Sequence, residues 1–459
     1  MSAQIVSDGK NATSTVSPVA EIDLKEERSL VWRLDIFFLT IGFLGYAFKY
    51  LDQTNISNAY VSGMETDLEL YGNELNYFTT FFNIGYMIML YPSCIIISHI
   101  GPSVWLPTCE VYGLRFLIGF FEGATWPGYF TIISQWYLPH EMALRMSIYN
   151  IAQPVGAMLS GAMQGALSTN LEGALGRSGW RWAFIINGVC TIFIALLAFT
   201  LLPGFPDRPN PLAKFYLRPR DIAIAEERTR RIGRDPQVGI NIKTFLRCFK
   251  FWHVWLFSIA WAIGTNTTPS NYFNLWLKSL KNPDGSLKYS VGMLNYLPIA
   301  GQALQLVAEL LFSGFSDYLG TRLPFLLLHS VINITSLIIL IIRPESESAY
   351  MAGWYMNYVG AVSTMLLCAW ASAHLEKEPQ VRTVLFATGT LFSYLFSAFL
   401  PIAAYPAAQA PHWHIGAKLY LGLSVFDAAL FVSIFFAFKW QARRDKRKER
   451  AEQGDSSDL

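Results

Sequence analysis

Charged residues are scarce in this chain. Asp, Glu, Lys and Arg make up 15% of its 459 residues and hydrophobic residues make up 53%, whereas soluble domains are roughly 25% charged. A single soluble core would not use that much apolar surface, so a soluble globular protein is excluded. Cysteine is also rare. The five cysteines are Cys94, Cys109, Cys190, Cys248 and Cys368. They lie in apolar segments without C-x-x-C spacing, so we expect neither a disulfide nor a metal site.

Several functional signatures are missing as well. The sequence has no phosphate-binding loop and no arrangement of nucleophile and base that predicts an enzyme. Its basic runs flank apolar segments, which is typical of membrane proteins rather than of nucleic-acid binding. The first thirty residues lack the apolar region of a signal peptide, so we expect the first apolar segment to be retained. We therefore predict no catalytic residues, no cofactor and no nucleic-acid partner.

Long apolar segments dominate what is present. A helix needs about 20 mostly apolar residues to cross a bilayer, because each backbone polar group must be paired within the helix. Eleven segments fit this description, and the sequence predicts an all-α polytopic membrane protein. The predicted spans are Leu34–Leu51, Asn76–Ile97, Tyr112–Tyr137, Arg145–Leu167, Arg181–Leu202, His253–Leu277, Val291–Gly314, Leu323–Ile342, Met351–His374, Thr383–Tyr405 and Gly416–Trp440.

The placement of basic residues predicts the orientation. Lys and Arg occur at eleven positions from Arg208 to Lys250 and at seven from Lys439 to Arg450, and basic loops face the cytoplasm. The predicted organisation is a cytoplasmic tail (1–33), a helical bundle (34–203), a basic cytoplasmic loop (204–252), a second bundle (253–440) and a cytoplasmic tail (441–459). Within the loop, 220–231 is expected to form a surface helix with Ile222, Ala225 and Thr229 on one side.

The number of spans before the basic loop is odd. It should be even, because the N-terminal tail and the loop are both predicted to be cytoplasmic. Five spans precede the basic loop and six follow it, so one helix is missing from the first bundle. The shortfall falls between Ser98 and Leu114, where the connection is too short for a loop and a span of about 20 residues.

Two similar halves around a cytoplasmic loop indicate a parallel repeat of six helices. Residues 314–322 also read G-x-x-D-x-x-G-x-R, which resembles the loop pattern G-x-x-x-D-x-x-G-x-R but is one residue shorter before its acid, Asp317; Arg322 is its base. The chain thereby resembles the major facilitator superfamily, which implies two six-helix bundles. Asp317 and Arg322 would form an ion pair that exists in one orientation of the halves, although an ordinary charged turn remains an alternative.

A second set of motifs narrows the resemblance. Residues 50–59 (YLDQTNISNA), residues 115–128 (RFLIGFFEGATWPG) and the pattern W-Y-x-x-x-E-x-x-x-R that ends in Glu141 and Arg145 are similar to the anion:cation symporter family. Within it, the chain looks closest to fungal allantoate and pantothenate permeases. Relatives carry a full third helix between the residues matching Glu110 and Val111, so about twenty residues are absent here.

The first span concentrates ionisable and polar residues. Lys49, Asp52 and Gln53 stand at i, i+3 and i+4, which places them on one helical face. An ionisable group inside a span costs at least about 2.5 kcal/mol, so it normally faces the bundle interior. A protonated Asp52 would leave Lys49 free to attract a carboxylate, and an ionised Asp52 would compete for it. The alternative for Lys49 is a structural ion pair or a side chain that extends to the membrane surface.

The third predicted span adds Arg115 and Glu122, seven residues apart on one face. The resemblance implies that Asp52 and Glu122 carry protons while cations line the substrate cavity. Many relatives have Arg where this chain has Gln53, so anion binding is assigned to Lys49 or Arg115. Polar residues in the cavity are expected to include Asn55 and Asn271, and Glu309 is either a coupling residue or a packed acid.

Together these features predict a secondary transporter that imports a small organic anion, such as pantothenate or a related vitamin or ureide, with protons. Its expected partners are the substrate, protons and the lipid bilayer, and we expect a monomer in the plasma membrane. Export of an acidic metabolite is an alternative. A nutrient sensor or an inactive copy without transport is another, because a helix is missing.

Overall fold

The structure is a computed structural model of the chain. It describes residues 24–70, 72–100, 122–123, 125–206, 208–231, 242–375 and 378–455. The predicted gap near Glu110 and Val111 lies outside these residues, as does Arg115.

The described residues before the basic loop are almost entirely helical. The bounds of the helices are α1 (Leu24–Leu34), η1 (Asp35–Leu39), α2 (Thr40–Ala59), η2 (Tyr60–Met64), α3 (Glu65–Asp67), α4 (Glu74–Ile100), α7 (Thr125–Trp136), α8 (Pro139–Asn170), η3 (Ala174–Gly176) and α9 (Gly179–Leu201). We call this part the first half.

The loop that follows has structure of its own. A two-stranded antiparallel sheet pairs β1 (Gly204–Phe205) with β2 (Arg208–Pro209), with Gly204 opposite Pro209. Then come η4 (Pro211–Phe215), α10 (Pro219–Arg231) and α11 (Ile242–Cys248). A helix at 220–231 was predicted and is confirmed, but its buried face was not, because Ile224, Ala225 and Arg228 are buried.

The remainder of the chain, which we call the second half, is also helical. Its elements are α12 (Trp252–Asn266), η5 (Pro269–Tyr272), α13 (Phe273–Ser279), α14 (Val291–Leu319), α15 (Leu323–Ile342), α16 (Glu347–Asn357), η6 (Tyr358–Ala361), α17 (Val362–His374), α18 (Pro379–Ala404), η7 (Ala407–Gln409) and α19 (Gly416–Asp455).

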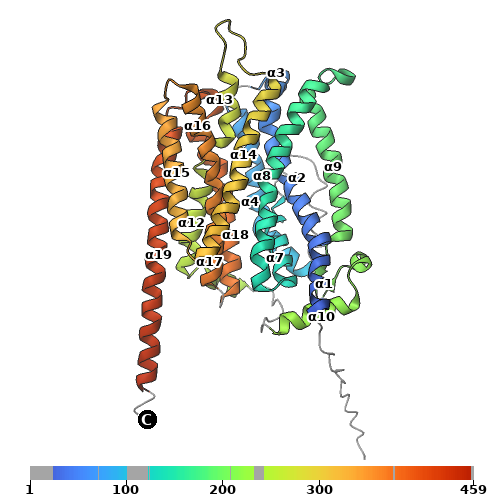
Figure 1. Ribbon diagram of the computed structural model, residues 1–459, viewed down its shortest axis with the longest axis vertical. Coiled ribbons are helices and arrows are strands. Elements are labelled where there is room, and N and C mark those ends of the chain that lie inside the picture. The colour runs from blue at the N-terminus through green and yellow to red at the C-terminus, as the bar shows by residue number, and fades with distance from the viewer. Residues whose placement is uncertain are drawn as a thin grey trace, which may run out of the picture.

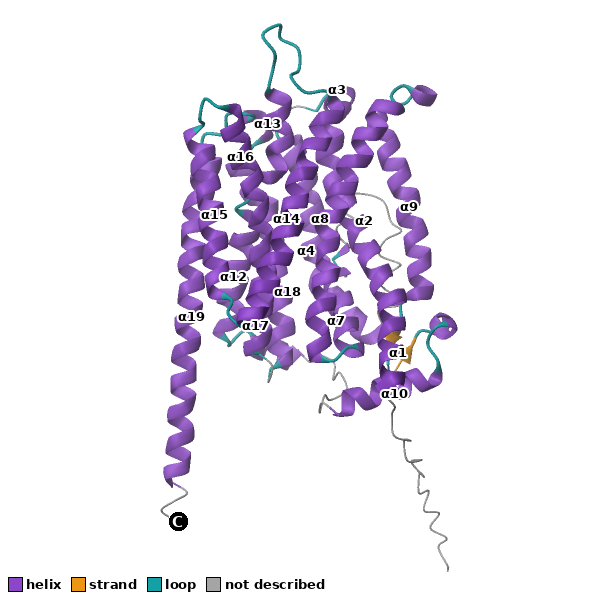
Figure 2. Cartoon of the chain, in the orientation of Figure 1, coloured by secondary structure: helices purple, strands orange, loops and turns teal. Residues whose placement is uncertain are grey.

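The long helices run side by side along one axis, which gives the molecule two ends (Figure 1). Helices α1 and α10 and the last turns of α19 lie at one end, which we call the basic end. Helices α3, α13 and the start of α16 lie at the opposite end. Almost all regular structure is helical, as the sequence predicts (Figure 2). Helix α19 is 40 residues long and projects beyond its neighbours at the basic end.

Six helical segments in the described residues are long and apolar enough to cross a membrane: Leu24–Asp67, Gly179–Leu201, Val291–Ser316, Leu323–Ile342, Gln380–Gln409 and Gly416–Arg444. This supports a polytopic membrane protein, whereas the total of eleven spans stays a prediction. Two predicted spans are wrong as single helices. His253–Leu277 is broken between α12 and α13 by η5, which Pro269 opens, and Met351–His374 is broken by η6.

Small residues set the distance between the central helices. A Cβ atom on Gly156 of α8 would lie 2.0 Å from the backbone oxygen of Ala47 in α2, and one on Gly161 would lie 2.8 Å from the backbone oxygen of Asn295 in α14. Only glycine allows such an approach, and close backbone contact is how membrane helices gain packing energy. Helix α8 therefore joins the first half to the second.

Candidate functional site

Lys49 is a buried cation in the middle of α2, with an exposed fraction of 6%. Its Nζ atom lies 4.6 Å from the ring centre of Tyr86, 5.4 Å from that of Tyr46 and 5.6 Å from that of Tyr50. It also donates a hydrogen bond to the Tyr86 hydroxyl at 3.2 Å. Phenol rings stabilise an ammonium through their π faces. We call these three rings the tyrosine cage.

The described residues hold the ammonium by these rings and not by an ion pair. Among the ion pairs of the described residues, none includes Lys49. Tyr86 in α4 stacks on Tyr394 of α18 with 3.8 Å between ring centres, so the cage extends from the first half to the second. A buried ammonium surrounded by aromatic rings has the chemistry to accept a carboxylate from outside the chain.

Glu122 is a predicted proton site, and the structure places it near the Lys49 ammonium. Glu122 is buried, and its Oε2 atom accepts a hydrogen bond from Gln53 Nε2 at 3.3 Å. Its charge acts on Lys49 without forming an ion pair. Lys49, Gln53 and Glu122 therefore form one polar group at the centre of the first half.

Asp52 does not share the face of Lys49 and Gln53 as fully as the sequence suggests. Its carboxylate accepts a hydrogen bond from the Asn187 side chain of α9, whereas Lys49 and Gln53 turn toward Tyr86 and Glu122. Positions i and i+3 are separated by about 60° around a helix. This is enough to send Asp52 to a different neighbour.

Asn55 and Asn271 fall in contrasting surroundings. Asn55 is completely buried, and neither of its side-chain polar atoms has a hydrogen-bond partner. Asn271 is exposed in η5, and among the described residues no hydrogen bond or ion pair connects it to the tyrosine cage. An unpaired buried amide is costly, so Asn55 is a group that a polar ligand or water would stabilise.

Some residues of this site are absent from the sequence prediction. Tyr86, Tyr394 and Asn187 come from separate helices, and tyrosine in an apolar segment carries no signal that distinguishes it from a packing residue. The Tyr50 and Tyr46 positions, one turn apart beside Lys49, were the signal that could have predicted an aromatic environment.

The two halves are joined by polar contacts at the end opposite the basic loop. Asn274 Nδ2 donates to Asn58 Oδ1 at 2.9 Å, Asn295 Nδ2 donates to Ser62 Oγ at 2.9 Å, and Lys278 pairs with Glu65. We call these six residues the polar seal. Beside it, α4 donates to α18 and to the chain that follows α18, through Asn76, Thr80 and Asn83. Between the two ends, Tyr394 of α18 also forms side-chain hydrogen bonds with Gln53 and Tyr86 of the first half.

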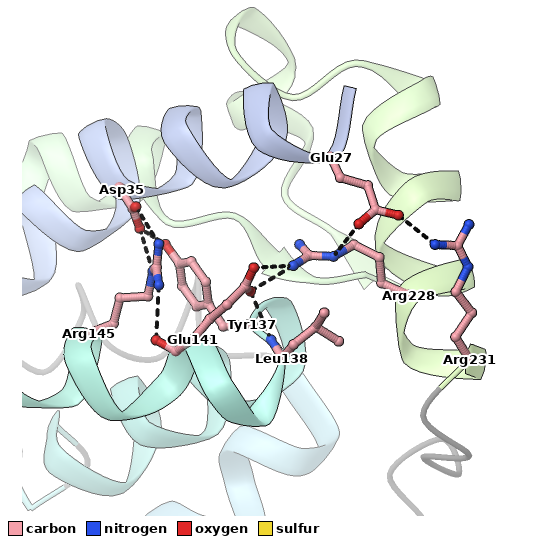
Figure 3. A network of polar contacts seen from close by, with 8 residues as sticks. All are labelled: Glu27, Asp35, Tyr137, Leu138, Glu141, Arg145, Arg228 and Arg231. Carbon is pink, nitrogen blue, oxygen red and sulfur yellow. Dashed lines mark hydrogen bonds and ion pairs between the residues drawn. The ribbon is translucent and has the colours of Figure 1, made fainter. Parts of the chain in front are cut away.

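The basic end holds a different network, confined to the first half and the loop (Figure 3). Arg145 of α8 contacts both oxygens of Asp35, at 2.8 and 2.7 Å. Glu141 accepts from the Leu138 backbone at 3.0 Å and from Arg228 of α10 at 2.6 Å. Arg145 also donates to the Glu141 backbone oxygen at 3.0 Å. The side chains of Glu141 and Arg145, the motif residues predicted to act in conformational change, form ion pairs with different residues.

The same network reaches α1. Arg228 lies 3.8 Å from Glu27, which pairs with Arg231 at 2.7 Å. Arg33 forms two hydrogen bonds to Asp221 at the start of α10, at 2.9 and 2.6 Å. Helix α10 is therefore fixed to α1 and α8 by charge-assisted contacts.

The other predicted conformational motif is described in part. Arg322 donates to Ser316 Oγ at 2.8 Å, which holds it against the last turn of α14. The side chain of Asp317 lies outside the described residues, so its ion pair with Arg322 stays a prediction.

Comparison with known proteins identifies the family. Residues 104–401 match the Major Facilitator Superfamily. The chain belongs to that superfamily. It is accordingly a multi-pass membrane transporter and not an enzyme, as the sequence predicts.

Individual relatives agree with this assignment. The chain is 32% identical over 413 residues to the MFS transporter PfmaC of Pestalotiopsis fici, covering 85% of this chain and 76% of that one. It is 27% identical over 436 residues to the pantothenate transporter FEN2 of Saccharomyces cerevisiae, covering 89% and 84%. The partially occluded inward-open xylose transporter XylE from E. coli superposes with a TM-score of 0.62 at 14% identity, covering 89% and 99%.

Proposed function

We propose that this protein imports a small organic anion with protons across the plasma membrane, and that pantothenate is the first substrate to test. The observation that carries the proposal is Lys49, a buried ammonium held by tyrosine rings with Glu122 close by. A transported carboxylate would supply the anion that this ammonium lacks. The similarity to a pantothenate transporter of yeast adds support for this substrate.

Protons enter the proposal through Glu122 and Asp52. An ionised Glu122 attracts the Lys49 ammonium and repels an incoming carboxylate, whereas a protonated Glu122 does neither. Proton binding and anion binding at neighbouring groups then favour each other, which is the thermodynamic basis of coupled transport. Asp52 is a second proton site in this proposal, with Asn187 as its hydrogen-bond donor.

The polar seal gives the proposal a direction of access. If the basic end is cytoplasmic, as the positive-inside rule predicts, the described conformation is joined at the outer end and belongs to the inward-facing class. Asn58, Asn274 and their partners would separate when the site opens to the outside. Arg115 and Asn271 remain proposed substrate contacts.

Uptake of radiolabelled pantothenate in a yeast strain that lacks its own permease tests the function. We expect uptake driven by an inward proton gradient, with Glu122→Gln unable to accumulate substrate against a gradient yet still able to exchange it. Exchange does not require release of the proton. Concentrative uptake by Glu122→Gln at the normal level would remove Glu122 from the mechanism. Failure of the unmodified chain, present in the membrane, to take up any carboxylate would refute the proposal.

A further inference from the structure

Glu309 is a second buried acid, and it comes from the other half of the molecule. It lies in the middle of α14, and 7% of it is exposed. The buried positions of this helix include Gln305, Ala308 and Glu309, whereas Leu304, Val307 and Leu311 are 40–50% exposed on the other side. The carboxyl group therefore points away from the lipid face and toward the protein interior.

The surroundings of Glu309 connect it to the tyrosine cage. Its Oε1 atom accepts a hydrogen bond from Gln305 Nε2 at 2.9 Å. The Tyr50 hydroxyl of α2 lies within electrostatic reach of two carboxyl groups, Glu122 from the first half and Glu309 from the second. One acid comes from each half of the molecule, and both act electrostatically on this phenol.

Charged residues elsewhere on the packed helices already have partners. The elements that pack on α14 include α8, α13, α16, α17, η2 and η6. Among their described side chains, the charged ones pair with other residues: Glu141 with Arg228, Arg145 with Asp35, Lys278 with Glu65, and Glu347 with Lys288. The other titratable residues with described side chains on these elements are Tyr60, Tyr149, Tyr350, Tyr355, Tyr358, Cys368 and His374.

An amide donor is the one partner that the described residues give Glu309. A buried carboxylate normally has a cation partner, and without one the neutral acid is favoured. An anionic substrate beside Lys49 would repel an ionised Glu309 across the Tyr50 phenol. Substrate binding and proton binding at Glu309 would therefore strengthen each other.

We propose that Glu309 binds a transported proton, so that the second half contributes one proton site to the coupling while Glu122 contributes one from the first half. This inference rests on the proposed function for its coupling role, whereas protonation of Glu309 can be measured separately. In each cycle Glu309 takes up a proton on the outer side before the anion binds. It releases the proton on the inner side after the anion leaves.

Infrared difference spectroscopy of the full-length protein in lipid tests protonation without any substrate. We expect a protonated-carboxyl band that titrates with pH, that disappears in Glu309→Gln and that remains in Glu347→Gln. Glu347 is a suitable control because the hydrogen bond from Lys288 lowers the pKa of its carboxyl group at the surface. The same spectrum in Glu309→Gln and in the unmodified protein would overturn the assignment of a proton site to Glu309.

The proton-to-substrate ratio tests the coupling role. Purified protein in liposomes is supplied with radiolabelled pantothenate while an internal dye records proton entry. We expect Glu309→Gln to carry one proton fewer per substrate, and Glu309→Asp and Glu347→Gln to keep the original ratio. An unchanged ratio in Glu309→Gln overturns the coupling role. If the unmodified protein moves no protons with pantothenate, the proposed function fails, and the infrared titration alone decides whether Glu309 is a proton site.

Discussion

Lys49 is held in the protein by aromatic rings rather than by a carboxylate, and this distinguishes a binding cation from a structural one. A structural ion pair satisfies the ammonium permanently, whereas a cation over phenol rings gains about 0.5–2 kcal/mol and stays available for a stronger partner. The distances of 4.6 to 5.6 Å to three rings fit this second situation.

Removal of the ammonium should therefore weaken substrate binding more than folding. We expect Lys49→Ala to lower the apparent affinity for the anion at least tenfold, which corresponds to about 1.4 kcal/mol. Adding Gln53→Arg should restore part of the loss, because it places a cation beside Glu122 one turn further along α2. Transport assays at several substrate concentrations measure both effects. Unchanged affinity in Lys49→Ala, at a normal amount in the membrane, would make Lys49 structural.

Single residues were also where sequence reasoning was most limited. The spacing of Lys49 and Gln53 correctly placed them near each other because helical geometry is local. Asp52 departed because its partner, Asn187, is 135 residues away, and no local pattern contains that contact. The resemblance marked Glu122 as a proton site but did not place it near Lys49, and Tyr394 could not be identified because apolar segments contain many aromatic residues.

At the scale of elements, helix type was predictable but helix continuity was not. Apolar runs of sufficient length require helices in a membrane, so the sequence was reliable on that point. The breaks at η5 and η6 depend on side chains that re-pair the released backbone groups. One example is His329, whose Nε2 atom lies 2.9 Å from the backbone oxygen of Gly360 in η6.

The contact between α2 and α8 yields a test of packing. A methyl group on Gly156 would lie 2.0 Å from the Ala47 backbone oxygen, which cannot be relieved by rotating a side chain. We expect Gly156→Ala to destabilise the protein by about 1–3 kcal/mol, the usual cost of overpacking. Gly422→Ala in α19 is the matched control, because no atom lies within 4 Å of its added methyl. Thermal unfolding in detergent measures both, and equal melting temperatures would show that the two helices can separate without cost.

At the scale of the whole molecule, the polar seal should control which end is open. The Glu65 and Lys278 side chains are 34% and 26% exposed, and such a partly exposed ion pair contributes about 0.2–1 kcal/mol. We expect Lys278→Gln to favour a conformation in which the two halves separate at the end that holds the polar seal. The ratio of this conformation to the described one should rise by no more than about fivefold. Spin labels at the exposed positions Leu175 and Ile415 would record a longer distance.

Lys288→Gln is the control for that experiment. It removes the ion pair with Glu347, which lies within the second half, so the label distances should not change. A distance distribution that responds equally to both substitutions would mean that the seal does not hold the halves together.

The orientation of the molecule is open to a direct test. We expect tags inserted at residue 230 and at the C-terminus to lie on the same, cytoplasmic side, because dense Lys and Arg flank both positions. Protease protection in sealed cells or vesicles reports the side of each tag. Cleavage of the residue 230 tag from outside would contradict the orientation and the inward-facing assignment with it.

The length of helix α19 would convert a small rotation of the second half into a large displacement of its far end. Its 40 residues amount to about 60 Å at 1.5 Å per residue, which is about twice the hydrocarbon thickness of a bilayer. A tilt of the second half by about 10° would move the far end of such a helix by about 10 Å. A fluorophore attached there would convert a small rotation within the membrane into a displacement large enough to follow in single molecules.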